Sequence, residues 1–156
     1  MDKLIEIDVD KCTGCRICEL ACSLHHERRC IPSKSRIHAI IWAEEGVSVP
    51  VVCSHCDDAP CTKACKYEAL WRDPATGAVL VMEDSCIGCK MCLVACPYGC
   101  MGYGKDKRKA FKCDLCGGDP ACCKACPTKA IEYIKADKTA IARKRGYAKT
   151  LAKGLM

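Results

Sequence analysis

Residues 86–97 read CIGCKMCLVACP, in which four cysteines follow the spacing C-x2-C-x2-C-x3-C and a proline follows the last of them. The first three cysteines recur at three-residue intervals, which places their sulfur atoms around a single loop. The x3 step puts Cys96 about one helical turn beyond Cys92, on a short helix after the loop. A run of this kind offers converging soft ligands, so it predicts a metal centre.

The same pattern recurs along the chain, and sixteen of the nineteen cysteines fall into four quartets. Each quartet begins with C-x2-C and ends with an x3 step, while the middle step varies. The repeat defines the fold, because each quartet marks one ligand loop and one short helix. In chain order the quartets are Cys12, Cys15, Cys18 and Cys22; Cys53, Cys56, Cys61 and Cys65; Cys86, Cys89, Cys92 and Cys96; and Cys113, Cys116, Cys122 and Cys126.

The composition leaves little for a conventional core, since the 156 residues include one Phe, five Tyr and two Trp. A chain so poor in aromatic side chains needs disulfides or metal to hold its fold. Its N-terminal sequence, MDKLIEIDVDKCTGC, shows no basic stretch followed by an apolar run, so no secretory signal is expected. No apolar run approaches the ~18 residues that span a bilayer. We therefore expect a soluble, cytoplasmic protein whose thiols stay reduced and bind metal.

Iron–sulfur clusters suit the cysteine spacing better than zinc does. A cubane cluster needs four thiolates that converge from a loop, and C-x2-C-x2-C-x3-C-P is the signature of bacterial two-cluster ferredoxins. Zinc sites instead pair two C-x2-C knuckles across roughly a dozen or more residues. Because every ligand position is a cysteine, the quartets predict four [4Fe–4S] clusters.

The formal net charge of +6 would otherwise suggest a nucleic-acid binder. Four oxidised clusters with their thiolates add about −8, which brings the loaded protein to about −2. The basic residues therefore compensate the charge of the clusters, and we expect no nucleic-acid partner.

The segments between the quartets predict an α+β fold of short helices and β-hairpins. Alternating apolar and polar residues predict the strands, and turn residues at 44–46 and 73–77 predict that four of these strands form two hairpins. The predicted strands are residues 4–9, 36–42, 47–52, 69–71 and 78–81.

With the quartets in place, the chain resembles the four-cluster ferredoxin subunits of molybdenum and tungsten oxidoreductases, formate dehydrogenases, hydrogenases and carbon monoxide dehydrogenases. The resemblance covers residues 8–134, and its most specific parts are CSHCDDAPC (53–61) and CDLCGGDPACCKACPT (113–128). A narrower resemblance, in CTGCRICELAC (12–22) with His25-His26 and residues 35–37, is to the small partners of tungsten aldehyde oxidoreductases.

In that family the first and fourth motifs share their clusters, as do the second and third. The resemblance therefore implies that the fourth cysteine of each quartet binds the neighbouring cluster. It gives site 1 as Cys12, Cys15, Cys18 and Cys126; site 2 as Cys113, Cys116, Cys122 and Cys22; site 3 as Cys53, Cys56, Cys61 and Cys96; and site 4 as Cys86, Cys89, Cys92 and Cys65.

Carried onto the chain, this pairing interleaves two bacterial-ferredoxin-like units. The outer two-cluster unit comprises residues 1–30 and 105–135, and the inner two-cluster unit, residues 31–104, is inserted into it. Residues 136–156 form a basic tail without cysteine, whose apolar residues recur at helical spacing. We expect this tail to be a helix that either lies in solvent or docks on a partner protein, a neighbouring copy or a membrane. Docking on neighbouring copies would build a homo-oligomer or filament.

Three cysteines stay outside the quartets. Cys123 is the neighbour of Cys122 and competes with it as a ligand, although the family spacing favours Cys122. Cys30 and Cys100 are expected as small buried apolar side chains. The four histidines are expected in solvent or as hydrogen-bonding partners beside the clusters, and the two tryptophans at the surface or an interface.

No nucleophile–base pair, phosphate-binding loop, flavin fingerprint or nucleotide fingerprint accompanies the cysteines. We therefore expect no active site of the chain's own. The expected function is electron relay between a catalytic oxidoreductase subunit and a second redox protein, with a tungsten or molybdenum aldehyde oxidoreductase of anaerobic metabolism as the most specific expectation. A freely diffusing polyferredoxin is the alternative within this class, and a zinc-stabilised binding module is the alternative outside it.

Overall fold

The computed structural model describes residues 3–136, so the predicted C-terminal tail beyond Ala136 lies outside the described residues. Short strands alternate with short helices, and the predicted α+β fold class is confirmed. The strands are β1 (Lys3–Ile7), β2 (Ile37–Trp42), β3 (Val47–Val52), β4 (Leu70–Arg72), β5 (Val79–Val81), β6 (Gly102–Gly104), β7 (Lys109–Phe111) and β8 (Ile131–Lys135). The helices are α1 (Ile17–Glu27), α2 (Pro60–Lys63), α3 (Met91–Ala95) and α4 (Ala121–Ala125), with 3-10 turns η1 (Val9–Lys11), η2 (Pro32–Lys34) and η3 (Leu115–Gly118).

Within residues 3–136 the strands form four separate two-stranded antiparallel sheets. β2 pairs with β3, from Ile37 opposite Val52 to Trp42 opposite Val47. β4 pairs with β5 in the same manner. These are the two hairpins that the alternating residues and the turn residues predict, and both predictions are confirmed.

A third hairpin, β6 with β7, escapes the sequence analysis. Gly102 and Gly104 make β6 a poor strand by residue preference. In the structure Gly102 lies opposite Phe111, and a Cβ on Gly102 would lie 2.4 Å from the Phe111 ring. The aromatic side chain therefore covers the glycine across the strand pair, which compensates for its lack of a side chain.

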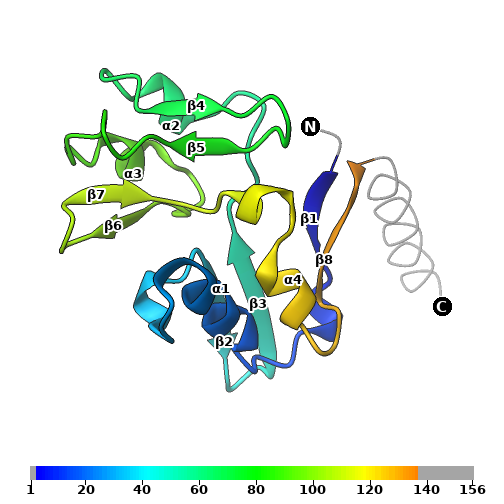
Figure 1. Cartoon of the computed structure of the whole chain (residues 1–156). Coiled ribbons are helices and arrows are strands. Elements are labelled where there is room, and N and C mark those ends of the chain that lie inside the picture. Colours follow the sequence, from blue (N-terminus) through cyan, green and yellow to red (C-terminus); the bar gives the residue numbers. More distant parts are fainter. Residues whose placement is uncertain (1–2, 137–156) are drawn as a thin grey trace.

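The first and fourth quartets come together because the two ends of the described chain lie side by side. β1 pairs with β8, from Lys3 opposite Lys135 to Ile7 opposite Ile131, and Figure 1 shows the blue β1 beside the orange β8. α1 also packs against α4, whereas α2 packs against α3. The first and fourth quartets are thus joined by one helix pair, and the second and third quartets by the other.

α1 has the capped, one-sided character of a helix that packs on a core. It follows Arg16 and ends at Arg28, both of which have left-handed backbone angles, and the Arg28 N–H donates to the Leu24 carbonyl. The buried Glu19 carboxylate accepts a hydrogen bond of 2.7 Å from the Ala39 N–H and so ties α1 to β2. At eleven residues, α1 is the longest described helix, and no helix in this part of the chain is long and apolar enough to cross a membrane.

Two clusters of buried side chains follow the same division. The first combines Ile37, Val52, Ala78, Leu115 and Ile131 with the thiols of Cys18, Cys22, Cys113 and Cys122. The second combines Ala59, Ala69, Leu70, Val79, Met101 and Ala110 with the thiols of Cys61, Cys86 and Cys92. Predicted ligands therefore occupy much of both cores. The β2–β3 hairpin contacts α1 and η1 and supplies residues to the first cluster, while the division into outer and inner units stays a prediction.

Candidate iron–sulfur centres

Two cavities beside α2 and α3 are lined by cysteines. Cys53, Cys56, Cys61 and Cys96 line the first, together with His55, Lys112 and Cys100, a cysteine outside the quartets. Cys65, Cys86, Cys89 and Cys92 line the second, together with Tyr67 and Met91. Each cavity combines three cysteines of one quartet with the fourth cysteine of the other, and these are the sets defined above as site 3 and site 4. Four thiols around one cavity fit the ligand requirement of a cubane cluster.

The packing of α1 on α4 gathers cysteines of sites 1 and 2. Cys18, Cys22, Cys113 and Cys122 share one buried cluster, and Cys126 packs against it. Cys12 and Cys116 are half-buried, whereas Cys15 is exposed. The helix pair thus brings the first and fourth quartets together, and the ligand roles of their members stay a prediction.

Backbone N–H groups donate to the sulfur atoms of four predicted ligands. Such donors favour the thiolate form, and hydrogen bonds to sulfur also set the potentials of iron–sulfur clusters. The bonds run from Arg36 to Cys22 (3.2 Å), from His55 to Cys53 (3.4 Å), from Cys100 to Cys96 (3.4 Å) and from Leu115 to Cys113 (3.5 Å).

Burial opposes the charged form of several of these thiols. It raises the pKa of Cys18 to about 12, and the nearby Cys122 thiolate adds to that shift. It likewise raises the pKa of Cys92 to about 11, with a further contribution from Cys86. At Cys126 burial also opposes charge, but hydrogen bonds, including one from the Ile131 N–H, outweigh it and lower the pKa. Iron bound at the buried thiols would therefore displace protons and compensate the thiolate charge.

Two of the cysteine loops require glycine. Gly14 (φ +68°) and Gly88 (φ +75°) occupy equivalent positions, directly before the second cysteine of the first and third quartets. A Cβ on Gly88 would lie 2.1 Å from the Arg108 carbonyl oxygen. Arg16 and Lys90, which follow those cysteines, also have positive φ and precede α1 and α3. Each loop therefore has a left-handed residue on either side of its second cysteine, and the loop of the third quartet leaves no room for a side chain at Gly88.

We expect Gly88→Ala to destabilise the protein by roughly 2–4 kcal/mol, because positive φ and a backbone clash both oppose the alanine. The variant should also lose iron from site 4, which its loop forms. Gly99→Ala is the matched control, since Gly99 has φ +63° but nothing within 4 Å of its Cβ position. Thermal unfolding and iron content measured on both variants check the prediction. Equal losses in the two variants would show that the contact with Arg108 is unimportant.

The family model of the 4Fe–4S dicluster domain matches residues 45–136, which is more than half of the chain. The chain belongs to the 4Fe–4S dicluster domain family. The polyferredoxin-like subunit of an aliphatic sulfonate oxidoreductase from Pyrococcus furiosus is 45% identical over 131 residues, which cover 84% of this chain and 75% of that protein. The electron transport protein HydN of Escherichia coli is 40% identical over 163 residues, with coverage of 88% and 91%. The resemblance to iron–sulfur electron-transfer subunits is thereby confirmed.

A solved protein structure has the same fold as this chain. The active site complex BamBC of benzoyl coenzyme A reductase, as isolated, contains a chain that matches with a TM-score of 0.52 and 23% sequence identity. The match covers 98% of this chain and 96% of that one. At this level of identity the similarity concerns the fold alone.

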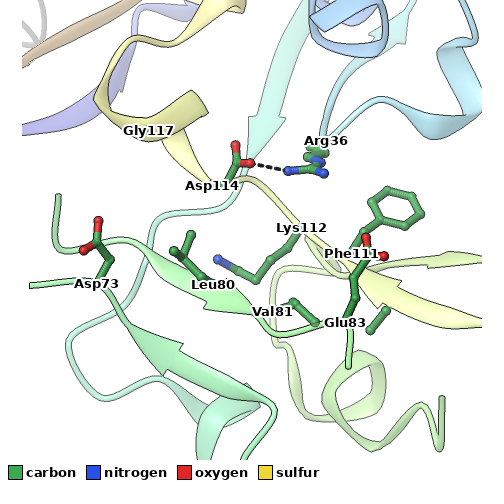
Figure 2. Close-up of a pocket in the computed structure, with 10 residues that line it drawn as sticks. Arg36, Asp73, Leu80, Val81, Glu83, Phe111, Lys112, Asp114 and Gly117 are labelled. Carbon is green, nitrogen blue, oxygen red and sulfur yellow. Dashed lines mark hydrogen bonds and ion pairs between the residues drawn. The ribbon is translucent and has the colours of Figure 1, made fainter. Parts of the chain in front are cut away.

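Charged side chains that the sequence analysis did not single out support site 2. Asp114 accepts a 2.6 Å hydrogen bond from Arg36 and a 2.8 Å hydrogen bond from the Cys116 N–H. Although burial opposes its charge, Arg36 contributes to lowering the pKa of Asp114. Figure 2 shows this ion pair at the edge of a cavity of about 310 Å³ whose lining includes no cysteine. His26 Nε2 lies 3.8 Å from Cys116 Sγ, as expected of a histidine beside a cluster.

The cysteines outside the quartets differ in their surroundings. Cys30 is exposed, so the prediction that its side chain is buried is wrong. It follows Arg28, at which α1 ends, and lies in the loop that leads to η2. Cys100 is half-buried and lines the cavity of site 3. Trp42 and Trp71 are 47% and 40% exposed, in agreement with their expected surface positions.

Proposed function

We propose that this chain carries four [4Fe–4S] clusters, one at each of sites 1–4, and relays electrons between the catalytic subunit of a larger oxidoreductase and a second redox protein. One observation carries the proposal. The second and third quartets each contribute three cysteines to one of the two cavities and their fourth cysteine to the other. Two-cluster ferredoxins hold their clusters in this way. A bound [4Fe–4S] cluster would supply a one-electron carrier without any active site of the chain's own.

The packing supports a linear order of the four sites. The α1–α4 contact joins sites 1 and 2, and the α2–α3 contact joins sites 3 and 4. Lys112, which directly precedes Cys113 of site 2, also lines the cavity of site 3. This arrangement favours sites 2 and 3 as neighbours, and we propose the order site 1, site 2, site 3, site 4 along the relay.

Exposed apolar side chains accompany the two ends of this order. Of the sixteen predicted ligands, which all lie within the described residues, Cys15 of site 1 and Cys89 of site 4 are the exposed ones. Near Cys15 in the chain, Ile17, Leu20 and Leu24 on α1 are exposed. Near Cys89, the exposed apolar residues are Ile87, Met91 and Val94, the last to 82%. Groups of exposed apolar side chains, rather than single ones, are typical of protein–protein contacts. We assign one redox partner to each end.

For the catalytic partner we infer a tungsten or molybdenum aldehyde oxidoreductase in the cytoplasm. The narrower sequence resemblance in residues 12–22 supports this assignment. The relative from Pyrococcus furiosus belongs to an oxidoreductase that its name connects with aliphatic sulfonates. Formate hydrogenlyase subunit 2 of Escherichia coli, 32% identical over 92% of this chain, belongs to a different complex. The names of these relatives support the proposal that this chain binds a catalytic subunit. The narrower resemblance supports an aldehyde oxidoreductase as the class of that subunit.

Purification of the tagged chain from its source without air tests the proposal. We expect about sixteen iron and about sixteen acid-labile sulfide per chain. We also expect a larger subunit that carries tungsten or molybdenum to co-purify at fixed stoichiometry. Zinc in place of iron, or about eight iron per chain, would contradict the four-cluster proposal. Full iron content without any co-purifying subunit would favour a freely diffusing polyferredoxin.

A further inference from the structure

His55 is a buried polar side chain with one nitrogen that has no partner. The residue lies between Cys53 and Cys56 and is 2% exposed. Its Nε2 atom is buried and makes no hydrogen bond to the described residues. An unpaired buried N–H costs free energy unless another group accepts from it. His55 lines the cavity that also contains Cys53, Cys56, Cys61 and Cys96, so an acceptor in site 3 would lie next to this ring.

The contacts of the other ring nitrogen determine where the proton of His55 resides. Nδ1 accepts a hydrogen bond of 3.0 Å from the Val79 N–H, and Lys112 Nζ lies 3.2 Å from the same atom. Because both neighbours are donors, Nδ1 carries no proton, and the neutral ring carries its proton on Nε2. Nε2 is therefore an N–H donor.

Lys112 places a positive charge beside the same cavity. Its side chain is 3% exposed, and Nζ contacts the Val79 carbonyl, the Cys113 carbonyl at 3.1 Å and His55 Nδ1. Three acceptors match the three protons of an ammonium group. Within residues 3–136 no carboxylate pairs with Lys112, and Figure 2 shows its side chain extending toward Leu80. Lys112 both lines site 3 and precedes Cys113 of site 2, so the charge lies at the junction of the two sites.

Both features act on the redox state in the same direction. Reduction adds one negative charge to a cluster, and an N–H donor or a nearby cation stabilises the more negative state. The effect of a buried charge is larger than that of a surface charge, because solvent screens it less. Lys107 differs from Lys112 on both counts, because its side chain is 63% exposed and its ammonium group pairs with Glu83.

We propose that His55 donates its Nε2–H to a sulfur atom of the cluster at site 3, and that the buried Lys112 ammonium raises the reduction potentials of sites 2 and 3. This inference rests on the proposed four-cluster function. Its consequence is that an electron is favoured in the interior of the relay, away from the exposed ends at Cys15 and Cys89. His55 and Lys112 are then residues that set the potential, while the cysteines alone hold the clusters.

Redox titration monitored by EPR, on chains first analysed for iron and sulfide, tests the inference. His55→Leu should keep its iron and lower one of the four reduction potentials by about 59 mV. For a one-electron couple, this shift changes the ratio of oxidised to reduced cluster about tenfold at a fixed solution potential. His55→Gln, which retains an N–H donor, should shift that potential less. Lys112→Met should lower two potentials, and Lys112→Arg should restore them. The control variants His38→Leu and Lys107→Met change exposed residues and should leave all four potentials in place.

The outcomes separate the two proposals. A wild-type chain with about eight iron would remove the four-cluster function itself, whatever the variants do. A fully loaded His55→Leu with unchanged potentials would overturn the role of His55, and a fully loaded Lys112→Met with unchanged potentials would overturn that of Lys112. If His55→Leu loses a cluster, pulsed EPR on protein labelled with 15N only in the imidazole rings of its histidines decides, because the His55 backbone N–H also donates to Cys53. A nitrogen coupling present in the wild type and absent in His55→Gln supports the hydrogen bond, and the lack of such a difference refutes it.

Discussion

Removal of iron and sulfide is expected to abolish the cooperative unfolding transition of this chain. The four separate two-stranded sheets explain why, since an isolated two-stranded hairpin is marginally stable in water. Apart from α1, the helices have four or five residues each, too short to form alone. Whatever joins these elements must therefore supply most of the stability.

The buried clusters point to the same conclusion. Seven of the predicted ligands are among their buried members, and burial raises the pKa of thiols such as Cys18 and Cys92. Without iron, the raised pKa values keep Cys18 and Cys92 neutral, and apolar side chains do not fill the space between the thiols. Structural metal sites contribute about 10–16 kcal/mol in zinc-finger peptides. A typical domain is stable by about 5–15 kcal/mol in total, so a single metal site can contribute as much as a whole domain's net stability.

Circular dichroism and thermal melting of chelated protein, kept reduced and free of air, check this expectation. The near-ultraviolet signal and the sharp melting transition should both disappear, and reconstitution with iron and sulfide should restore them. Since thiolates bind iron, reconstitution should also weaken as the pH falls, because protons compete for the buried thiols whose pKa is raised. A sharp transition and dispersed amide resonances in the iron-free chain would contradict the expectation.

The sequence predicts the parts of the fold that depend on local pattern. The C-x2-C steps define the loops, and the residues at 44–46 and 73–77 define the β2–β3 and β4–β5 hairpins, which the structure confirms. The pairing of β1 with β8 depends instead on residues at opposite ends of the described chain. Alternation marks β1 as a strand but carries no information about its partner. The family resemblance, which joins the first and fourth motifs, is the signal that indicates this long-range contact.

The surroundings of site 3 show a second limit of sequence analysis. For His55, as for the other histidines, the sequence predicts a place in solvent or a hydrogen-bonding role beside a cluster, and the structure buries it beside site 3. Lys112 is 57 residues away in the chain and resembles any other lysine in a basic segment. Only the tertiary fold, which brings Lys112 after β7 to Val79 of β5 and to His55, buries its ammonium group. Electrostatic tuning of this kind depends on tertiary packing, so spacing and composition do not reveal it.

Cys122→Ala is expected to remove or convert the cluster at site 2, whereas Cys123→Ala should leave all four clusters in place. Cys122 is 5% exposed and belongs to the same buried cluster as Cys22 and Cys113 of that site. Burial raises the pKa of Cys116, another predicted ligand of that site, to about 11. Cys123 is half-buried and packs against the same cluster from its edge.

Iron analysis and EPR of the two variants, purified without air, measure this difference. Cys122→Ala should fall from about sixteen iron to about twelve if the cluster is lost, or to about fifteen if a [3Fe–4S] centre remains. Since each cluster also stabilises the fold, its melting temperature should fall with the iron content. Cys123→Ala is the matched control, because it removes the adjacent thiol of the same short helix α4. The opposite pattern would make Cys123 the ligand and change the last intervals of the fourth quartet to C-x6-C-x2-C.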